Sequence, residues 1–321
     1  MGEIVFDDEI PWRDEIRLDA GWVDLISSAK QISSKHGLDF IVQSHDFIKI
    51  MASFNGKKAM IGSDAMKQFC FTIDDNIRFL KELTAQQPAS LFDHPYPALL
   101  RRLHRRFGVK VQLNLFYRMD GFDLSQMTDR YRQEWAEASH WLRLSFHSEL
   151  ENPYPYQRSG YDEVYDHCRR VHREILRFAG PDSLARTTTV HCCRTTPEGV
   201  RALADLGMGG LLGLYGTPQE PKISYSRDEA VAARLRAGET VTEDGMAYAA
   251  IDMIVNLVKL EDVAPKLTAL LERDSLHVMI HEQFFYADYR AYQPDFEEKL
   301  SRVFERLQSS GYESCFFETM L

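Results

Sequence analysis

From residue 69 to the end of the chain, short apolar runs alternate with longer segments whose apolar residues recur every three or four positions. The short runs are rich in β-branched and aromatic residues, which favours buried strands, and the longer segments have the period of amphipathic helices. The predicted strands are residues 69–73, 109–116, 141–147, 186–191, 209–215, 248–255, 276–281 and 314–319. The predicted helices between them include residues 96–107, 161–179, 197–207, 263–273 and 296–311.

Alternation of strands and helices is typical of an α/β fold, in which helical crossovers connect parallel strands. Some eight strands of this kind suggest closure into a (β/α) barrel. Residues 221–248 are polar and interrupt the alternation. We expect this segment to form an inserted hairpin or lid over one end of the barrel.

The first 68 residues have a different pattern. Residues 1–20 are expected to form a surface arm, and residues 21–37 have helical spacing that ends at a glycine. Residues 46–62 are predicted to form a hairpin, because Asn55-Gly56 suits a type I′ turn between two strands. We therefore predict a small N-terminal α/β cap, residues 1–68, packed on a barrel formed by residues 69–321.

Composition and charge exclude several kinds of partner. The chain is 44% hydrophobic and 27% charged, which is ordinary for a soluble globular protein. Its formal net charge of −10 argues against binding to nucleic acid or to an anionic membrane. No apolar run approaches the ~18 residues needed to span a bilayer, and the acidic N-terminus does not resemble a secretory signal. Five cysteines without a CxxC pair fit a reducing cytoplasm.

Acidic and histidine side chains follow four of the predicted strands. The candidates are Asp74, Asp75, His147, Glu149, Glu151, His191, His281 and Glu282. The C-terminal ends of barrel strands meet at one rim, and His, Asp and Glu that converge there are the usual ligands of a divalent metal with open positions. Two adjacent carboxylates after an apolar strand are costly without a nearby cation. We infer that one of the pair Asp74 and Asp75 binds a metal and the other acts as a base.

Simpler interpretations exist for each residue taken alone. Asp74 or Asp75 could cap the helix that follows, and His281 and Glu282 could form a local ion pair. A single histidine at the end of a strand is more often a packed residue than a ligand. The occurrence of these residues together at four strand ends favours a functional site.

Three motifs resemble those of the polysaccharide deacetylases, the chitooligosaccharide deacetylase homology family. FTIDDN, residues 71–76, resembles the first motif of that family, TFDDG, and SFHSELE, residues 145–151, resembles its second motif, H[ST]xxH. VMIHE, residues 278–282, is similar in placement to the closing motif, a histidine after an apolar strand. The resemblance extends over residues 69–319 and implies membership of the glycoside hydrolase/deacetylase superfamily. It implies the distorted (β/α) barrel of about seven strands that this superfamily shares.

The resemblance also implies roles for individual residues. Asp74 would be the general base, Asp75 and His147 metal ligands, and His281 the general acid. Glu151 stands where the family has its second histidine and could bind the metal as a carboxylate, or His191 could be the third ligand. The implied cofactor is a divalent metal, zinc in the first place, with cobalt, manganese or nickel as alternatives.

The function implied is a metal-dependent hydrolase that cleaves an N-acyl bond, a non-peptide C–N bond, on a sugar or a small related substrate. Asn76 departs from the family motif, which has glycine there, and the Arg-x-Pro-Tyr motif of the family is absent. Two alternatives therefore stay open: a glycosidase of the same superfamily with paired carboxylates, and a non-catalytic carbohydrate-binding protein that retains the fold. A cytoplasmic location favours a small or soluble substrate over a cell-wall polymer.

Overall fold

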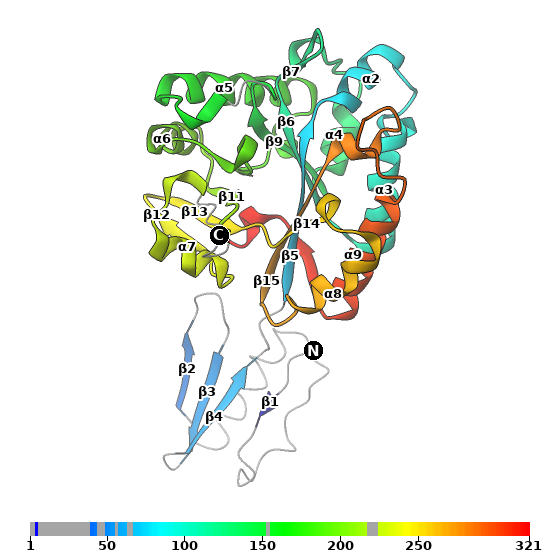
Figure 1. The fold of residues 1–321 in the computed structure, drawn as a ribbon. Helices are drawn as coiled ribbons and strands as arrows, with labels where there is room; N and C mark the ends of the chain where they lie inside the picture. Colours follow the sequence, from blue (N-terminus) through cyan, green and yellow to red (C-terminus); the bar gives the residue numbers. More distant parts are fainter. Residues whose placement is uncertain are drawn as a thin grey trace. The chain divides into compact units, whose positions relative to one another are not determined.

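The computed structural model describes residues 67–151, 155–216 and 224–321, together with the backbone of four strands in the N-terminal part. The chain divides into two compact units, Met1–Lys67 and Gln68–Leu321, and each is described by itself (Figure 1). The division at residue 68 and the packing of a cap on a barrel stay predictions.

The N-terminal unit contains a four-stranded antiparallel sheet in the order β1-β4-β3-β2. Its strands are β1 (Ile4–Val5), β2 (Asp39–Gln43), β3 (Lys49–Phe54) and β4 (Lys57–Gly62). Phe54 is opposite Lys57, which is the pairing expected of a hairpin. The turn residues 55 and 56 and the helix predicted over residues 21–37 lie outside the described residues.

The second unit is organised around a six-stranded parallel sheet in the order β14-β15-β5-β6-β9, with β16 also paired to β5 (Figure 1). Its strands are β5 (Gln68–Asn76), β6 (Val111–Phe116), β9 (Leu142–Ser148), β14 (Met253–Ile254), β15 (Ser275–His281) and β16 (Glu313–Cys315). The parallel pairing confirms the predicted α/β class.

A smaller sheet has the order β10-β11-β13-β12, in which only β12 runs antiparallel to its neighbour. Its strands are β10 (Thr187–Thr188), β11 (Gly210–Gly213), β12 (Val241–Glu243) and β13 (Met246–Ala250). A single parallel bridge joins Leu144 of β9 to Leu184, just before β10. After β13, Ile251 N donates to Gly213 O (2.8 Å) and Asp252 N donates to His277 O (2.9 Å). The chain thus passes from one sheet to the other at this point. A separate antiparallel pair, β7 (Arg118–Met119) and β8 (Phe122–Asp123), follows β6.

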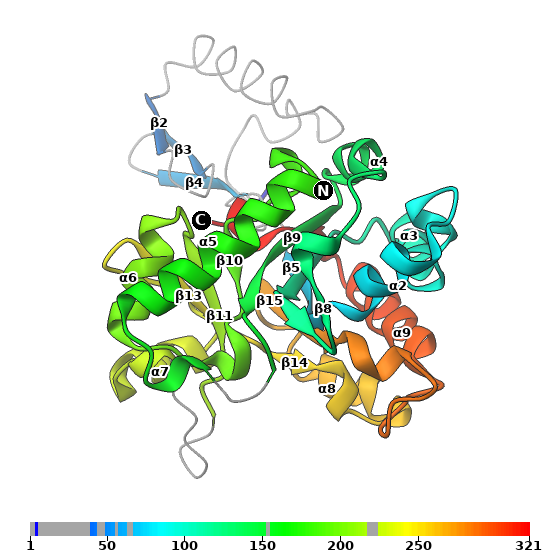
Figure 2. The same ribbon diagram turned by 90° about the horizontal axis from the view of Figure 1, so that it is seen from above.

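The helices of the second unit lie around the outside of its strands (Figure 2). The described α-helices are α2 (Arg78–Gln86), α3 (Pro95–Phe107), α4 (Arg132–Ala138), α5 (Tyr161–Phe178), α6 (Pro197–Asp205), α7 (Glu229–Arg236), α8 (Val263–Thr268) and α9 (Phe296–Ser309). None of the helices in the described residues is long and apolar enough to cross a membrane. All five cysteines are free thiols, and Cys192 is the exposed one.

The described part of the segment 221–248 combines the expected hairpin with a helix. It contains helix α7, which begins where the Asp228 side chain accepts a hydrogen bond from Val231 N (2.8 Å). Val231, Ala232 and Leu235 are buried, and this spacing forms one apolar helical face. The hairpin itself, β12–β13, is present but extends the edge of the smaller sheet. Whether the segment covers a barrel end stays a prediction.

Alternation along β5 separates the core from the polar positions. Phe69 and Phe71 pack on Phe304 of α9, with ring centroids 5.9 and 5.0 Å apart. Successive side chains of a strand point to opposite faces, so Thr72 and Asp74 lie on the face away from that helix. The apolar face holds β5 in place, and this leaves its other face and its C-terminal end for polar side chains.

Candidate metal centre

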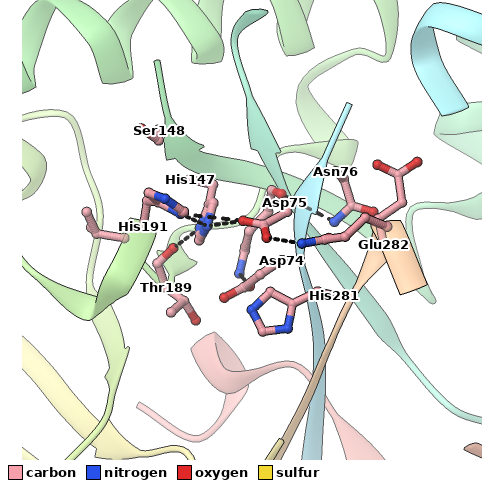
Figure 3. A network of polar contacts seen from close by, with 12 residues as sticks. Asp74, Asp75, Asn76, His147, Ser148, Thr189, His191, His281 and Glu282 are labelled. Atoms are coloured by element: carbon pink, nitrogen blue, oxygen red, sulfur yellow. Dashed lines mark hydrogen bonds and ion pairs between the residues drawn. The ribbon is translucent and has the colours of Figure 1, made fainter. Parts of the chain in front are cut away.

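The backbone of β5 is irregular at Asp75. The register of β5 against β6 shifts between Ile73 and Asn76, and Asp75 has a φ of 63°. This left-handed conformation costs a non-glycine residue about 1–3 kcal/mol and is frequent at functional sites. A regular strand would direct Asp74 and Asp75 to opposite faces. In the irregular strand both carboxylates reach the same polar network (Figure 3).

Asp75, His147 and His191 form a compact group, in which one ligand atom of each residue lies within 4.8 Å of the others. The Nε2 atom of His147 lies 3.0 Å from Asp75 Oδ1 and 3.1 Å from His191 Nδ1. The Nδ1 atom of His191 lies 3.4 Å from Asp75 Oδ1. Figure 3 shows the three side chains directed toward one another from separate segments of the chain.

Hydrogen bonds to neighbouring residues orient the side chains of Asp75 and His147. In each residue one ligand atom is left facing the other members of the group. His147 Nδ1 lies 2.5 Å from the carbonyl oxygen of Thr189. A carbonyl can only accept, so Nδ1 donates to Thr189, and Nε2 is the ring nitrogen that faces Asp75. The Oδ2 atom of Asp75 accepts from Gln283 Nε2 at 2.7 Å, and Oδ1 faces the two histidines.

The pKa shifts in this group show that positive charge is favoured beside Asp75. Burial acts to raise the pKa of Asp75, but hydrogen bonds to His147 and His191 hold that pKa well below its usual range. Burial acts to lower the pKa of His191, but its hydrogen bonds to Asp75 and Cys192 raise that pKa to about 10. Two imidazole nitrogens and one carboxylate oxygen are ligands that zinc and related divalent metals prefer, so the donor set fits such an ion.

Asp74 and His281 are located beside this group. They lie opposite one another in the parallel pairing of β5 with β15. Asp74 is buried, and its Oδ1 accepts from Asn114 Nδ2 at 2.7 Å. Burial raises the pKa of Asp74, and the charges of His147 and His281 oppose this effect. His281 Nδ1 lies 2.9 Å from Asn256 Oδ1.

The helix cap considered for Asp74 or Asp75 is supplied instead by Glu282. Its carboxylate accepts from the backbone N–H groups of Ile77 (2.7 Å), Arg78 (3.1 Å) and Phe79 (2.8 Å) at the start of α2. Burial raises the pKa of Glu282 to about 7, against the effect of these hydrogen bonds. The carboxylate at the end of β15 therefore has a structural role, and the pair at the end of β5 is left for the polar network.

The structure does not bring Glu151 to the other predicted residues. Glu151 is exposed and is not a member of the group around Asp75. Glu149 is buried and forms ion pairs with Arg118 (3.2 Å) and Arg170 (2.9 Å). His191 begins a 3-10 turn, His191–Cys193, and the strand predicted over residues 186–191 is only Thr187–Thr188.

Four residues of the network were not predicted from the sequence: Asn114, Thr189, Asn256 and Gln283. Amide side chains and a backbone carbonyl give little local signal. Position supplied the only clue, since Asn114 lies near the end of a predicted strand and Gln283 directly follows His281-Glu282.

Comparison with known proteins shows that several solved structures have a fold similar to that of this chain. No protein-family model matches the sequence, and no curated protein matches it. A putative polysaccharide deacetylase from Mycobacterium smegmatis is 11% identical, with 81% of this chain and 91% of that chain covered and a TM-score of 0.50. The 4-alpha-glucanotransferase from Thermococcus litoralis is 13% identical, with 79% of this chain and 40% of that chain covered and a TM-score of 0.51. A family 4 acetyl xylan esterase from Clostridium thermocellum, in complex with a cobalt ion, is 12% identical over 79% of this chain and 90% of that chain, with a TM-score of 0.42.

At these identities the likeness concerns the fold alone. The chain has a divergent α/β fold of the deacetylase-like kind. Its activity has to be argued from its own site.

Proposed function

We propose that this chain is a metal-dependent hydrolase of the polysaccharide deacetylase-like class, which cleaves an N-acyl bond on a sugar or a small related substrate. The observation that carries the proposal is the convergence of Asp75, His147 and His191, with Asp74 and His281 beside them. An acid, a base and a metal donor set gathered at one place form an arrangement that can catalyse hydrolysis of an amide.

Asp75 Oδ1, His147 Nε2 and His191 Nδ1 would hold a divalent metal, zinc in the first place and cobalt, manganese or nickel as alternatives. We propose His191 as the third ligand rather than Glu151, because Glu151 is exposed and lies outside the group. When bound, such an ion polarises an acyl carbonyl and makes a water molecule more acidic.

The remaining residues would move the protons. Asp74, held at Oδ1 by Asn114, would take a proton from the attacking water through its other oxygen. His281, held at Nδ1 by Asn256, would give a proton to the departing amine. The pairing of β5 with β15 keeps these two groups on adjacent strands.

We also propose that the strands of the second unit close into a distorted (β/α) barrel of seven or eight strands. The bridge from Leu144 to Leu184 supports closure on one side. The hydrogen bonds of Ile251 to β11 and of Asp252 to β15 support closure on the other. In such a barrel the site would lie at the C-terminal ends of the strands. A cytoplasmic location, proposed from five free cysteines, would favour a small or soluble substrate.

The proposal is tested by metal analysis followed by assays of hydrolysis. Protein purified without chelator should contain about one equivalent of a divalent metal in an elemental analysis. The loaded protein should hydrolyse acetylated amino sugars or chromogenic acetyl esters in the presence of zinc, cobalt or manganese. Metal-free protein that cleaves a glycosidic bond would favour the glycosidase. Metal-loaded protein that binds sugars but hydrolyses none of the acylated compounds would favour the carbohydrate-binding protein.

A further inference from the structure

Gln283 contacts the candidate metal centre with one end of its amide. It lies on the 3-10 turn Glu282–Phe285 that follows β15, and its Nε2 donates to Asp75 Oδ2 at 2.7 Å. A carboxylate can only accept, so this contact determines which end of the amide is the nitrogen. The Oε1 atom of Gln283 therefore points away from Asp75.

The other end of the same amide is buried without a partner. Gln283 Oε1 has no hydrogen-bond partner within the part of the chain that the structure describes. An acceptor left unsatisfied in a protein interior is destabilising, and such groups are uncommon in native proteins. On a residue that also holds a candidate ligand, such an acceptor is available to a donor on a molecule bound at the centre.

We propose that Gln283 is both a positioning residue for the metal ligand and a specificity residue for the substrate, an inference that rests on the proposed hydrolase function. Its Nε2 donates a hydrogen bond to Asp75 Oδ2, so that the other oxygen of Asp75, Oδ1, faces the metal. Its Oε1 accepts a hydrogen bond from a donor on the substrate, either the N–H of the acylamino group or a neighbouring sugar hydroxyl. The site thereby selects substrates that carry a donor next to the scissile bond.

The first test measures metal affinity and needs no substrate. Gln283→Met keeps the length of the side chain and removes both ends of the amide. The matched control is Gln308→Met on α9, which removes an amide that donates to the carbonyl of Phe107. Loss of a residue that orients a ligand typically weakens metal binding 10–100-fold, so we expect zinc affinity to fall by at least about tenfold in the first variant only. Equal affinities of wild type, Gln283→Met and Gln308→Met would overturn the positioning role.

The second test compares substrates in pairs. An acetylated amino sugar is compared with its N-methylated amide, which lacks the N–H, and with deoxy analogues that lack one hydroxyl. Removing the donor that Oε1 accepts should lower kcat/KM of the wild type about tenfold, the worth of one hydrogen bond. The same removal should have no effect in Gln283→Met, because the acceptor is already gone. The analogue that shows this pattern identifies the donor as the N–H or as a hydroxyl.

The outcomes separate this inference from the proposed function. Wild-type protein that binds no divalent metal would refute the function and this inference together. Metal-dependent hydrolysis with the same analogue effects in wild type and in Gln283→Met would refute the specificity role alone. If circular dichroism shows that Gln283→Met does not fold, Gln283→Ala replaces it. The analogue series on the wild type then tests the specificity role without any variant. If kcat/KM of the wild type is the same for every analogue as for the parent substrate, the specificity role is overturned.

Discussion

The Nε2 atom of His147 lies 3.0 Å from the Oδ1 atom of Asp75, although the two residues are 72 positions apart along the chain. We expect His147→Ala to weaken zinc binding by about 100-fold or more, because it removes one of three donor atoms and even the loss of a residue that only orients a ligand typically costs about 10–100-fold. Isothermal titration of metal-free protein with zinc measures the change. Glu151→Gln is the matched control, because it removes a predicted carboxylate that the structure leaves exposed, and its affinity should equal that of wild type. A loss of affinity in Glu151→Gln alone would reverse the ligand assignment.

Asp74→Asn should separate catalysis from metal binding. The amide keeps the shape of the side chain but cannot accept a proton, so the rate should fall about 10²–10⁴-fold, the usual contribution of a positioned base. Metal content should be unchanged, because Asp74 lies outside the group of three ligands. Assays of the metal-loaded variant and wild type under identical conditions measure the effect. Retention of full activity would remove Asp74 from the mechanism.

His281→Ala should discriminate between substrates by their leaving groups. An amine must be protonated as it departs, so hydrolysis of an acetylated amino sugar should slow about 10²–10⁴-fold. An activated ester departs without a proton and should be affected little. Parallel assays with both substrates measure the ratio of rates. An equal loss on amide and ester would assign His281 a role other than that of general acid.

Glu282 should contribute to stability through the start of α2. Its carboxylate accepts hydrogen bonds from three backbone N–H groups and from the hydroxyl of Tyr286. Glu282→Ala leaves these donors buried without a partner, so it should lower the free energy of unfolding by about 2–4 kcal/mol. Urea denaturation of metal-free protein measures the loss. Glu297→Ala is the control, since its ion pair with Arg102 is exposed and should be worth at most about 1 kcal/mol.

His277 should make the metal-free protein sensitive to acid. It is buried, neither ring nitrogen has a hydrogen-bond partner among the described residues, and burial lowers its pKa to about 4. An unfolded chain takes up this proton near pH 6.5, so stability is fully present above that pH and is lost as the pH falls toward 4. The loss should reach about 3 kcal/mol for this residue.

His277→Phe removes the titrating group from the same core position, where the imidazole packs edge-on against Phe317. Urea denaturation between pH 7.5 and 4.5, with a chelator present, should show a shallower acid slope in the variant than in wild type. Parallel slopes would show that other buried groups, such as His172 with a pKa of about 4, account for the acid dependence.

The sequence by itself determined the α/β class and most strands and helices of the second unit. Hydrophobic period is a local property, so the periodicity of residues 69–73 and 276–281 was sufficient to predict β5 and β15. Position at strand ends, together with the resemblance to the deacetylase motifs, was also sufficient to select Asp74, Asp75, His147, His191 and His281 as candidates.

Only the tertiary structure decided which candidates meet. Contacts between segments far apart in the sequence bring Thr189 to His147 and place His191 beside Asp75, whereas Glu151, four residues from His147, stays exposed. The irregular backbone at Asp75 and the contact of Gln283 with Asp75 depend on the register between strands far apart in the sequence. Proximity in space arises from long-range pairing, which leaves no trace in the local pattern of apolar and polar residues.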